Sequence, residues 1–386
     1  GIFPSPVPKS RFDIFIWDYF TTGEIYEANK EINLVRKLNA NEKRDIENSL
    51  NLIAKHITAV SNVELIDGYR RFDPNRGLDY IFNVKIKEPS SQVSIKRFRL
   101  VKPLTRAEIS GVPFATETAT VHIILPVIIT NQSETTLTSS FDRLSSFLTN
   151  YESNNLARRD EKIRLTILIG YFSENARLFF QPIGSRVEFL KRKFPYADVS
   201  FLEAFVRNLH NPTLELVYNN LNLSDNELCL IVNSEVQFDQ ELLNRVRLNT
   251  LPDFQIFCPI PFVNFKFRGN NTVIAAKQYA KISKYSGRFD AQQFFICSFY
   301  WSDFKRIWLN FMQISNSRSL RDVLDLFLLY SPKTKILRYA EPSLISDFTI
   351  RDCSQKEFDE YEFESCRYSN KANFASKKYY EPMIGL

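Results

Sequence analysis

The sequence predicts a mixed α/β protein in which a domain with a mostly parallel sheet, residues 119–386, follows a small α+β module, residues 1–118. Two observations indicate this. From residue 119 onward, apolar runs alternate with amphipathic segments, which is typical of a parallel sheet covered by helices on both faces. Before that point, one helical pattern precedes several runs that alternate apolar and polar residues, as antiparallel strands do. A chain of 386 residues is long enough for both units.

The α+β module is predicted to contain one helix and three strands. Apolar residues recur every three or four positions over 41–60, which predicts a helix with one apolar face. The strands are predicted at residues 63–69, 78–87 and 93–101. The first two are joined by residues 71–77, a segment rich in turn-forming residues.

The second unit is predicted from buried runs and the helical patterns between them. Strands are expected at residues 121–129, 163–169, 199–202 and 227–232, and helices at residues 141–151 and 186–194. A further helix is predicted to begin after Asp239 and to run through Val246. Asp239 is its expected N-cap, and Phe238 and Leu243 are placed to contact each other across the cap.

Composition excludes several classes of function. The chain has only 10 Gly and no G-x-G pair, so dinucleotide-binding fingerprints and P-loops are absent. The 3 His and 5 Cys do not have the spacing of zinc sites. The net charge of +6 is mild and accompanies no nucleic-acid recognition motif, so no nucleic-acid partner is expected. A solvated basic face or an acidic polysaccharide partner would both fit this charge.

Sequons and cysteines bear on the compartment. N-x-[ST] sequons begin at Asn131, Asn222 and Asn270, although sequons also arise by chance in an Asn-rich chain. Cys353 and Cys366 would close a short loop as a disulfide in an oxidising compartment. The alternative is that all five cysteines are unrelated buried thiols. The residues alone leave both interpretations open.

The loop after the strand at 227–232 is a candidate ligand site, because ligands of open α/β sheets bind beyond the carboxyl ends of strands. Nucleotide-sugar transferases of this architecture place a D-x-D motif there, whose carboxylates hold a divalent cation against the diphosphate. Here the loop reads Asn233-Ser-Glu235, with one carboxylate. A solvated loop without function is the other interpretation.

Several longer motifs resemble the C-terminal half of the chondroitin synthase and chondroitin N-acetylgalactosaminyltransferase family, and its polymerizing-factor branch more than its synthases. The resemblance covers nearly the whole chain. The motifs are Trp17-Asp-Tyr-Phe20, Gly68-Tyr-Arg-Arg-Phe-Asp-Pro74, Pro103-Leu-Thr-Arg-Ala-Glu-Ile109, Leu243-Asn-Arg-Val-Arg247, Ser286-Gly-Arg-Phe-Asp290, Phe299-Tyr-Trp-Ser-Asp303 and Asp322-Val-Leu-Asp-Leu-Phe327.

The resemblance implies a GT-A-like glycosyltransferase domain at residues 119–386, the second of two on a type II Golgi membrane protein. Active members transfer GalNAc from UDP-GalNAc to a glucuronate-ended chondroitin chain. The chain would then be a glycoprotein of the Golgi lumen, a piece of a longer protein whose anchor lies upstream. The resemblance also implies a disulfide between Cys353 and Cys366 and glycosylation at the sequons Asn131, Asn222 and Asn270.

The family's catalytic motifs fall on positions where this sequence departs from them. The D-x-D motif falls on Asn233-Ser-Glu235, so Asn233 and Glu235 are its remnant. The G-W-G-x-E-D segment falls on residues 317–322, where Asp322 is the surviving candidate base. Arg321 beside it is expected to depress the basicity of that carboxylate. The H-x-H-H-P segment, which carries a metal-ligand His, falls on Arg338-Tyr-Ala-Glu-Pro342.

We therefore expect a weakly or non-catalytic polymerizing-factor-like component of chondroitin biosynthesis. It would form a hetero-complex with a chondroitin synthase and contact the chondroitin chain during alternating GlcA and GalNAc addition. We expect no resident metal and no tightly bound cofactor. The alternative is an active hexosyltransferase that uses Mn²⁺ with UDP-GalNAc or UDP-GlcA. An unrelated lectin-like binder is a third possibility.

Overall fold

The structure is a computed structural model, and it describes most of the chain. The described residues are 7–28, 34–57, 62–73, 76–87, 93–103, 108–113, 118–129, 134–159, 162–172, 174–206, 211–264, 282, 286–314, 320–346, 353, 363, 366–367 and 369–370.

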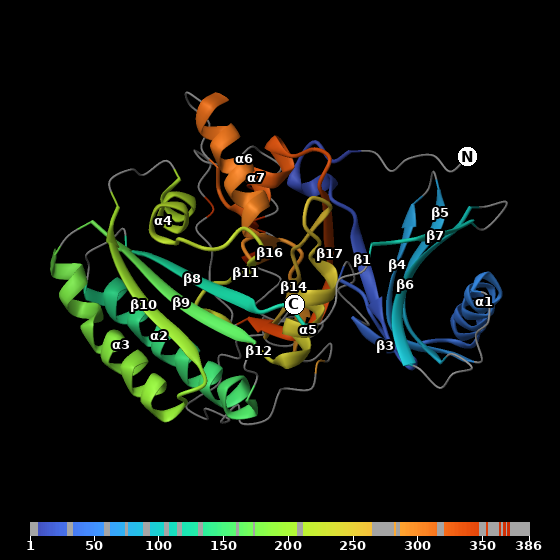
Figure 1. The fold of residues 1–386 in the computed structure, drawn as a ribbon, viewed down its shortest axis with the longest axis horizontal. Coiled ribbons are helices and arrows are strands. Elements are labelled where there is room, and N and C mark those ends of the chain that lie inside the picture. Colours follow the sequence, from blue (N-terminus) through green and yellow to red (C-terminus); the bar gives the residue numbers. More distant parts are fainter. Residues whose placement is uncertain are drawn as a thin grey trace, which may run out of the picture.

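The N-terminal part is an antiparallel sheet covered by one long helix (Figure 1). After a short 3-10 turn, Arg11–Asp13, its elements are β1 (Ile16–Phe20), β2 (Glu24–Tyr26), β3 (Val35–Lys37), α1 (Ala40–His56), β4 (Asn62–Asp73), β5 (Gly77–Lys87), β6 (Val93–Lys102) and β7 (Glu108–Gly111). Spatially the strands follow the order β3-β2-β1-β4-β5-β6-β7, every pair antiparallel. The predicted helix and three strands are confirmed.

Helix α1 forms where its sequence predicts it because both its start and its apolar face are encoded locally. Asn39 accepts a hydrogen bond from the Glu42 backbone, and the Glu42 side chain accepts one from the Asn39 backbone in return. Ile46 and Ile53 are buried against Phe82 and other apolar side chains of the sheet. The helix ends at His56, a few residues before the predicted end.

The second part contains a central sheet whose strands are mostly parallel. Its strands are β8 (Val121–Ile129), β9 (Ile163–Tyr171), β10 (Asp198–Phe205), β11 (Leu228–Ile231), β12 (Val236–Phe238), β13 (Gln255–Phe257), β14 (Ile260–Asn264), β15 (Gly287–Phe289), β16 (Cys297–Tyr300) and β17 (Lys335–Ser346). The central order is β10-β9-β8-β11-β16-β13-β17, in which only β16 runs antiparallel to its neighbours. The predicted α/β fold with a mostly parallel sheet is confirmed.

Helices cover both faces of this sheet (Figure 1). They are α2 (Glu134–Asn154), α3 (Glu174–Lys193), α4 (Pro212–Asn220), α5 (Gln240–Asn249), α6 (Trp301–Ile314) and α7 (Val323–Tyr330), with a 3-10 turn at Leu156–Arg158. In β8, Ile123 faces the cluster built with α2 and α3, whereas Ile124 faces the one built with α4, α6 and α7. Successive strand residues point to opposite faces of the sheet. Because both faces of β8 are covered by helices, nearly every residue along the strand has to be apolar to be buried well.

Helix α3 begins at Glu174, well before the predicted start at residue 186, and Pro182 lies inside it. A proline in a helix interior removes a backbone hydrogen bond and costs about 3 kcal/mol. Phe180 and Ile183 flank it and are buried in the core. Tertiary packing therefore maintains a helix that local signals disfavour.

Strand β17 connects the two parts of the molecule. Its first residues pair in parallel with β13, and Arg338 and Tyr339 then pair in parallel with Ile16 and Trp17 of β1. Further along, β17 pairs with β14 and, antiparallel, with β12. One strand therefore contacts both the N-terminal sheet and the segments that follow β11.

Candidate functional site

The turn between β11 and β12 holds Asn233 and Glu235, which the sequence resemblance aligns with a D-x-D motif. Asn233 Oδ1 accepts a hydrogen bond from the Glu235 backbone at 3.2 Å, which closes the turn. The Glu235 carboxylate accepts a hydrogen bond from Arg143 Nη1 of α2 at 2.8 Å. The structure therefore brings Asn233 and Glu235 together. The Arg143 guanidinium occupies the place beside the Glu235 carboxylate that a metal ion would take in a metal-binding loop.

Asp322 lies at a different place, as the N-cap of α7. Its Oδ1 accepts a hydrogen bond from the Asp325 backbone at 3.1 Å, and its Oδ2 accepts one from Arg11 Nη2 at 3.2 Å. Arg11 also pairs with Asp325, at 2.5 Å. Asp322 is thus the structural end of a helix, held by a residue from the beginning of the chain.

Burial sets the protonation behaviour of Asp322. Burial raises the pKa of the Asp322 carboxyl; the charge of Arg11 opposes this, the charge of Asp325 adds to it, and the Asp325 backbone N–H opposes it. Arg321 lowers this pKa, as expected, but burial outweighs it and the net shift is upward. Arg321 donates to Asp325 at 2.9 Å, and its effect on Asp322 is smaller than that of burial.

The positions of the H-x-H-H-P segment lie in β17, and Glu341 is the carboxylate among them. Arg245 of α5 donates to both Glu341 oxygens, from Nε at 2.7 Å and from Nη2 at 2.6 Å. Ser343 donates its backbone N–H to the same carboxylate at 2.9 Å. Burial raises the pKa of Glu341, and Arg245 opposes that shift. The carboxylate is therefore satisfied from within the chain.

Arg338, the first residue of the same segment, is also buried. Its Nη2 donates to the backbone oxygens of Ala291 and Gln293 at 3.0 and 2.9 Å. Its guanidinium stacks on the Phe294 ring, as that of Arg11 does. Burial lowers the pKa of Arg338 to about 9, and the charge of nearby Arg11 adds to this.

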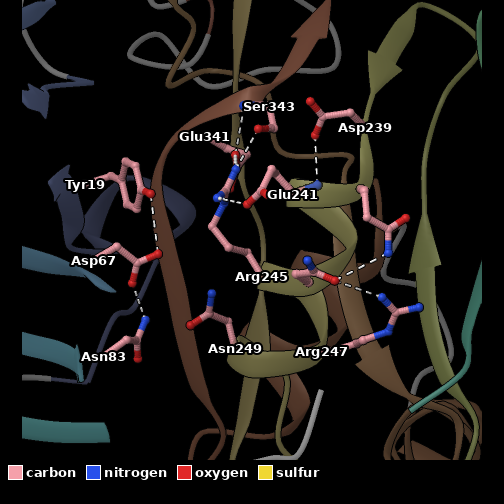
Figure 2. Close-up of polar contacts among 12 residues, drawn as sticks. Tyr19, Asp67, Asn83, Asp239, Glu241, Arg245, Arg247, Asn249, Glu341 and Ser343 are labelled. Atoms are coloured by element: carbon pink, nitrogen blue, oxygen red, sulfur yellow. Dashed lines mark hydrogen bonds and ion pairs between the residues drawn. The ribbon is translucent and has the colours of Figure 1, made fainter. Parts of the chain in front are cut away.

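A buried polar network runs from this segment into the N-terminal sheet, and Figure 2 shows Asn249 on the same helix as Arg245. Asn249 of α5 donates from Nδ2 to the hydroxyls of Tyr339 and Tyr69, at 2.8 and 3.1 Å. Its Oδ1 accepts a hydrogen bond from Arg97 of β6 at 2.6 Å. Buried polar groups must be paired, so these contacts fix how α5 lies against the N-terminal sheet.

The network continues through two further side chains of the N-terminal sheet. Arg97 Nε donates to Asn83 at 2.7 Å, and Asn83 donates to Asp67 at 2.5 Å. Figure 2 shows Asp67 between Asn83 and Tyr19. Burial raises the pKa of Asp67. No sequence pattern indicated that these residues form one network, although Tyr69 lies in the Gly68–Pro74 motif and Tyr339 in the Arg338–Pro342 segment.

These residues do not fit a divalent cation. Mn²⁺ and similar ions are held by several anionic or imidazole ligands together. In the part of the chain that the structure describes, no three His, Cys, Asp or Glu side chains gather into such a group. Glu235, Asp322 and Glu341 each face a different arginine, and Figure 1 shows β12 low in the view and α7 near its top.

Four of the five cysteines form disulfides. Cys353 is bonded to Cys366, and Cys258 to Cys297, a pair that the sequence analysis did not single out. Cys229 is a buried free thiol. Of the sequons, Asn222 is exposed, whereas Asn131 and Asn270 lie outside the described residues. Among the described helices, none is long and apolar enough to cross a membrane.

Known proteins resemble this chain over most of its length. Human chondroitin sulfate synthase 2 is 26% identical over 377 residues, 92% of this chain and 46% of that protein. Human chondroitin sulfate glucuronyltransferase is 24% identical over 407 residues, 95% of this chain and 50% of that protein. The chain thus spans about half the length of the curated relatives it matches.

Likeness to solved structures is weaker. The glycosyltransferase GlyE of Streptococcus pneumoniae, in its apo form, is 9% identical, with a TM-score of 0.31 over 67% of this chain and 66% of that one. A structural similarity of this size does not assign a function to the chain. The fold class is based on the strand pairing described above.

The family model described as chondroitin N-acetylgalactosaminyltransferase matches residues 1–379, which is nearly the whole chain. The relatives above carry related names, and the motifs on which the sequence resemblance was based extend from β1 to α7. The chain therefore belongs to the chondroitin N-acetylgalactosaminyltransferase family.

Proposed function

We propose that this chain takes part in chondroitin biosynthesis as a polymerizing-factor-like component whose own transferase domain is weakly or not catalytic. It acts in a hetero-complex with a chondroitin synthase and supports the alternating addition of GlcA and GalNAc. Family membership and the names of the relatives support the pathway. The pairing of the carboxylates at the motif positions with arginines supports weak or absent catalysis.

One observation carries the proposal: each carboxylate left at the family's motif positions is paired with an arginine of the same chain. Glu235 pairs with Arg143, Asp322 with Arg11 and Glu341 with Arg245. A cation that bound one of these carboxylates would have to displace a guanidinium that already satisfies it. Removing one partner of a buried pair costs about 3–5 kcal/mol, so such displacement is unfavourable.

The three pairs differ in strength. Arg245 and Glu341 are almost fully buried, and Arg11 and Asp322 nearly so, whereas the Arg143 side chain is 45% exposed. An exposed pair contributes only about 0–1 kcal/mol. Glu235 is therefore the carboxylate most easily freed, and any residual transferase activity would depend on it.

The same family assignment supports a proposal for the location and domain organisation of the chain. We propose that residues 1–118 and 119–386 are separate units of a Golgi-luminal, N-glycosylated segment anchored upstream in a type II membrane protein. Two disulfides and an exposed sequon at Asn222 support an oxidising lumen.

A chondroitin polymerisation assay tests the function. The full-length parent is incubated with both UDP-sugars and an acceptor oligosaccharide, alone and together with a chondroitin synthase. We expect little product from the parent alone and longer chains from the mixture than from the synthase alone. Equal chain lengths with and without the parent would overturn the partner role.

A thermal-shift measurement on this chain tests the state of its own site. UDP-GalNAc and UDP-GlcA are added with and without Mn²⁺, because a ligand that binds only the native state raises the midpoint of unfolding. We expect no Mn²⁺-dependent increase. A clear Mn²⁺-dependent increase with either sugar nucleotide would instead favour an active hexosyltransferase.

A further inference from the structure

A basic surface lies where α2 and α3 end, outside the family motifs quoted above. Figure 1 shows α2 and α3 side by side on one face of the central sheet. The end of α2 continues into the 3-10 turn Leu156–Arg158, and the Tyr196 hydroxyl, just after α3, donates to the backbone oxygen of Leu156. Two chain segments therefore meet here, and the basic surface consists of five of their residues: Arg158, Arg159, Arg186, Arg192 and Lys193.

Three guanidinium groups of the basic surface are open. The side chains of Arg158, Arg159 and Arg192 are exposed, and none of them forms a hydrogen bond or an ion pair with a residue that the structure describes. A free guanidinium can hold a carboxylate through two parallel hydrogen bonds. Lys191, the remaining basic residue in the last turn of α3, pairs with Glu188 at 2.7 Å and is not part of the surface.

The other two members of the basic surface share one carboxylate. Arg186 Nη2 and Lys193 Nζ each lie 2.6 Å from an oxygen of Glu152. A single negative charge cannot balance two cations, so this part of the surface also keeps positive charge. Both cations lie beside the ring of Phe189, whose centroid is 5.1 Å from Arg186 Cζ and 6.0 Å from Lys193 Nζ, and Phe189 is 47% exposed. The ring therefore helps to hold both charges at the surface of the molecule.

The openness of the basic surface determines which kind of anion suits it. Its charges are exposed and come from two segments, so each one is screened by water and salt and gains little from a single small anion. A polymer with repeated negative charges contacts several of them at once, and each contact raises the effective concentration for the next. The surface therefore suits an extended polyanion.

The basic surface lies along α2 from the turn that holds Glu235. Arg143 of α2 pairs with Glu235, and the stretch of α2 from Arg143 to Glu152 is about 13 Å long at the rise of an α-helix. Just beyond the end of α2, Asn155 Nδ2 donates to the backbone oxygen of Phe238 in β12 at 3.2 Å. A polymer whose end lies at the β11–β12 turn is therefore within a few sugar units of the basic surface.

We propose that the basic surface binds an extended acidic polysaccharide through the carboxylates of its uronate units, as a second contact beyond the β11–β12 turn. The identity of this polysaccharide as chondroitin rests on the proposed function. Unsulfated chondroitin carries one carboxylate in each disaccharide and no other charge, so carboxylates are the groups that the open guanidinium groups would hold. An acidic segment of a protein is the competing occupant.

Equilibrium binding to this 386-residue chain tests the proposal. The probe is an unsulfated chondroitin decasaccharide. It is compared with the same decasaccharide after reduction of its glucuronate carboxyls to alcohols, and with a poly-glutamate peptide of the same net charge. The variant is Arg158→Gln with Arg192→Gln, two exposed side chains whose loss breaks no contact within the described part of the chain. The matched control is Arg44→Gln with Lys55→Gln, which removes the same charge from the exposed side of α1.

We expect the unmodified protein to bind the decasaccharide and the Arg158/Arg192 variant to bind it about tenfold more weakly. The α1 control should match the unmodified protein. The carboxyl-reduced probe should bind about tenfold more weakly or not at all, and raised ionic strength should weaken the binding of the unreduced probe.

Three results would overturn the proposal: no binding of the decasaccharide, equal binding of the carboxyl-reduced probe, or unchanged affinity in the Arg158/Arg192 variant. If poly-glutamate binds as tightly as the decasaccharide, the basic surface is reassigned to an acidic protein partner.

The binding measurement needs no transfer reaction, so it is independent of the test of function. If the polymerisation assay fails while decasaccharide binding still depends on Arg158 and Arg192, the proposed function falls and the saccharide surface stands. If the decasaccharide does not bind while the parent still lengthens the chains made by a synthase, only the saccharide surface falls.

Discussion

Arg245 and Glu341 form a two-point ion pair in which the guanidinium Nε lies 2.7 Å from one carboxylate oxygen and Nη2 lies 2.6 Å from the other. The two residues are 96 positions apart in the chain and are almost completely buried. Glu341 lies in the segment that the sequence resemblance aligns with H-x-H-H-P. The pair thus connects α5 to β17 within that segment.

Loss of this pair is expected to destabilise the fold strongly. Glu341→Gln would remove the buried partner of Arg245 and leave only the exposed Glu241 near its charge, and we expect the free energy of unfolding in urea to fall by about 3–5 kcal/mol. The matched control is Glu241→Gln, because Glu241 lies 3.4 Å from Arg245 but is 65% exposed. That change should cost less than about 0.5 kcal/mol. Similar losses in both variants would show that burial of the pair does not set its strength.

Glu235→Ala is expected to leave chondroitin polymerisation with a synthase partner nearly unchanged. The reason is that Glu235 pairs with Arg143 and lacks the further ligands that a metal site needs. If the site were active, loss of its metal carboxylate would cost several kcal/mol of transition-state stabilisation. Since each 1.36 kcal/mol is a factor of ten in rate, a ~100-fold loss would be plain.

The control for this assay is Glu188→Ala, a change at an exposed carboxylate of α3 whose ion pair within the described part of the chain is with Lys191, three residues later. Both variants should bind the partner as the unmodified protein does. A ~100-fold loss of polymerisation in Glu235→Ala alone, with partner binding intact, would favour the active hexosyltransferase.

The two disulfides are expected to stabilise the fold by different amounts because they close loops of different length. On the chain-entropy estimate, the Cys353–Cys366 bond, with a separation of 13, contributes about 3 kcal/mol, and the Cys258–Cys297 bond, with a separation of 39, about 4 kcal/mol. Double Cys→Ser variants compared by urea unfolding measure this. A larger loss at the 353–366 pair would contradict the loop-length argument.

His122 is expected to make stability depend on pH. Its Nδ1 lies 3.0 Å from Glu227, and its Nε2 lies 2.7 Å from the Thr166 hydroxyl. Burial lowers the pKa of His122 below 6.5; Glu227 opposes the shift, and Arg164 adds to it. Because the unfolded chain binds the proton more tightly, the stabilising contribution is fully present above about pH 6.5 and declines as the pH falls toward the folded pKa.

The measurement compares the unmodified protein with His122→Gln between pH 7 and pH 5. The buried carboxyls of Asp67, Asp322 and Glu341 have raised pKa values and give the opposite trend, so only the difference between the two proteins isolates His122. We expect the unmodified protein to lose stability more steeply below pH 6.5, by at most about 1.36 kcal/mol per pH unit. Parallel curves would contradict the role of His122.

Much of the fold was determined by the sequence itself because its signals are local. The unbroken apolar run of β8 requires a strand that is covered on both faces, and Asp239 begins α5 by accepting from the Glu241 backbone, as predicted. Family motifs located Asn233, Glu235, Asp322 and Glu341 without any structure. Such features depend on residues a few positions apart, so a single sequence is sufficient to find them.

The tertiary structure alone decided what those residues do. Asp322 is an N-cap paired with Arg11, which lies 311 positions away, and Glu341 is neutralised by Arg245. The bond between Cys258 and Cys297 forms because β13 and β16 are paired. Contacts of this kind depend on how strands are ordered in space, and no local pattern of residues encodes which distant side chains that order brings together.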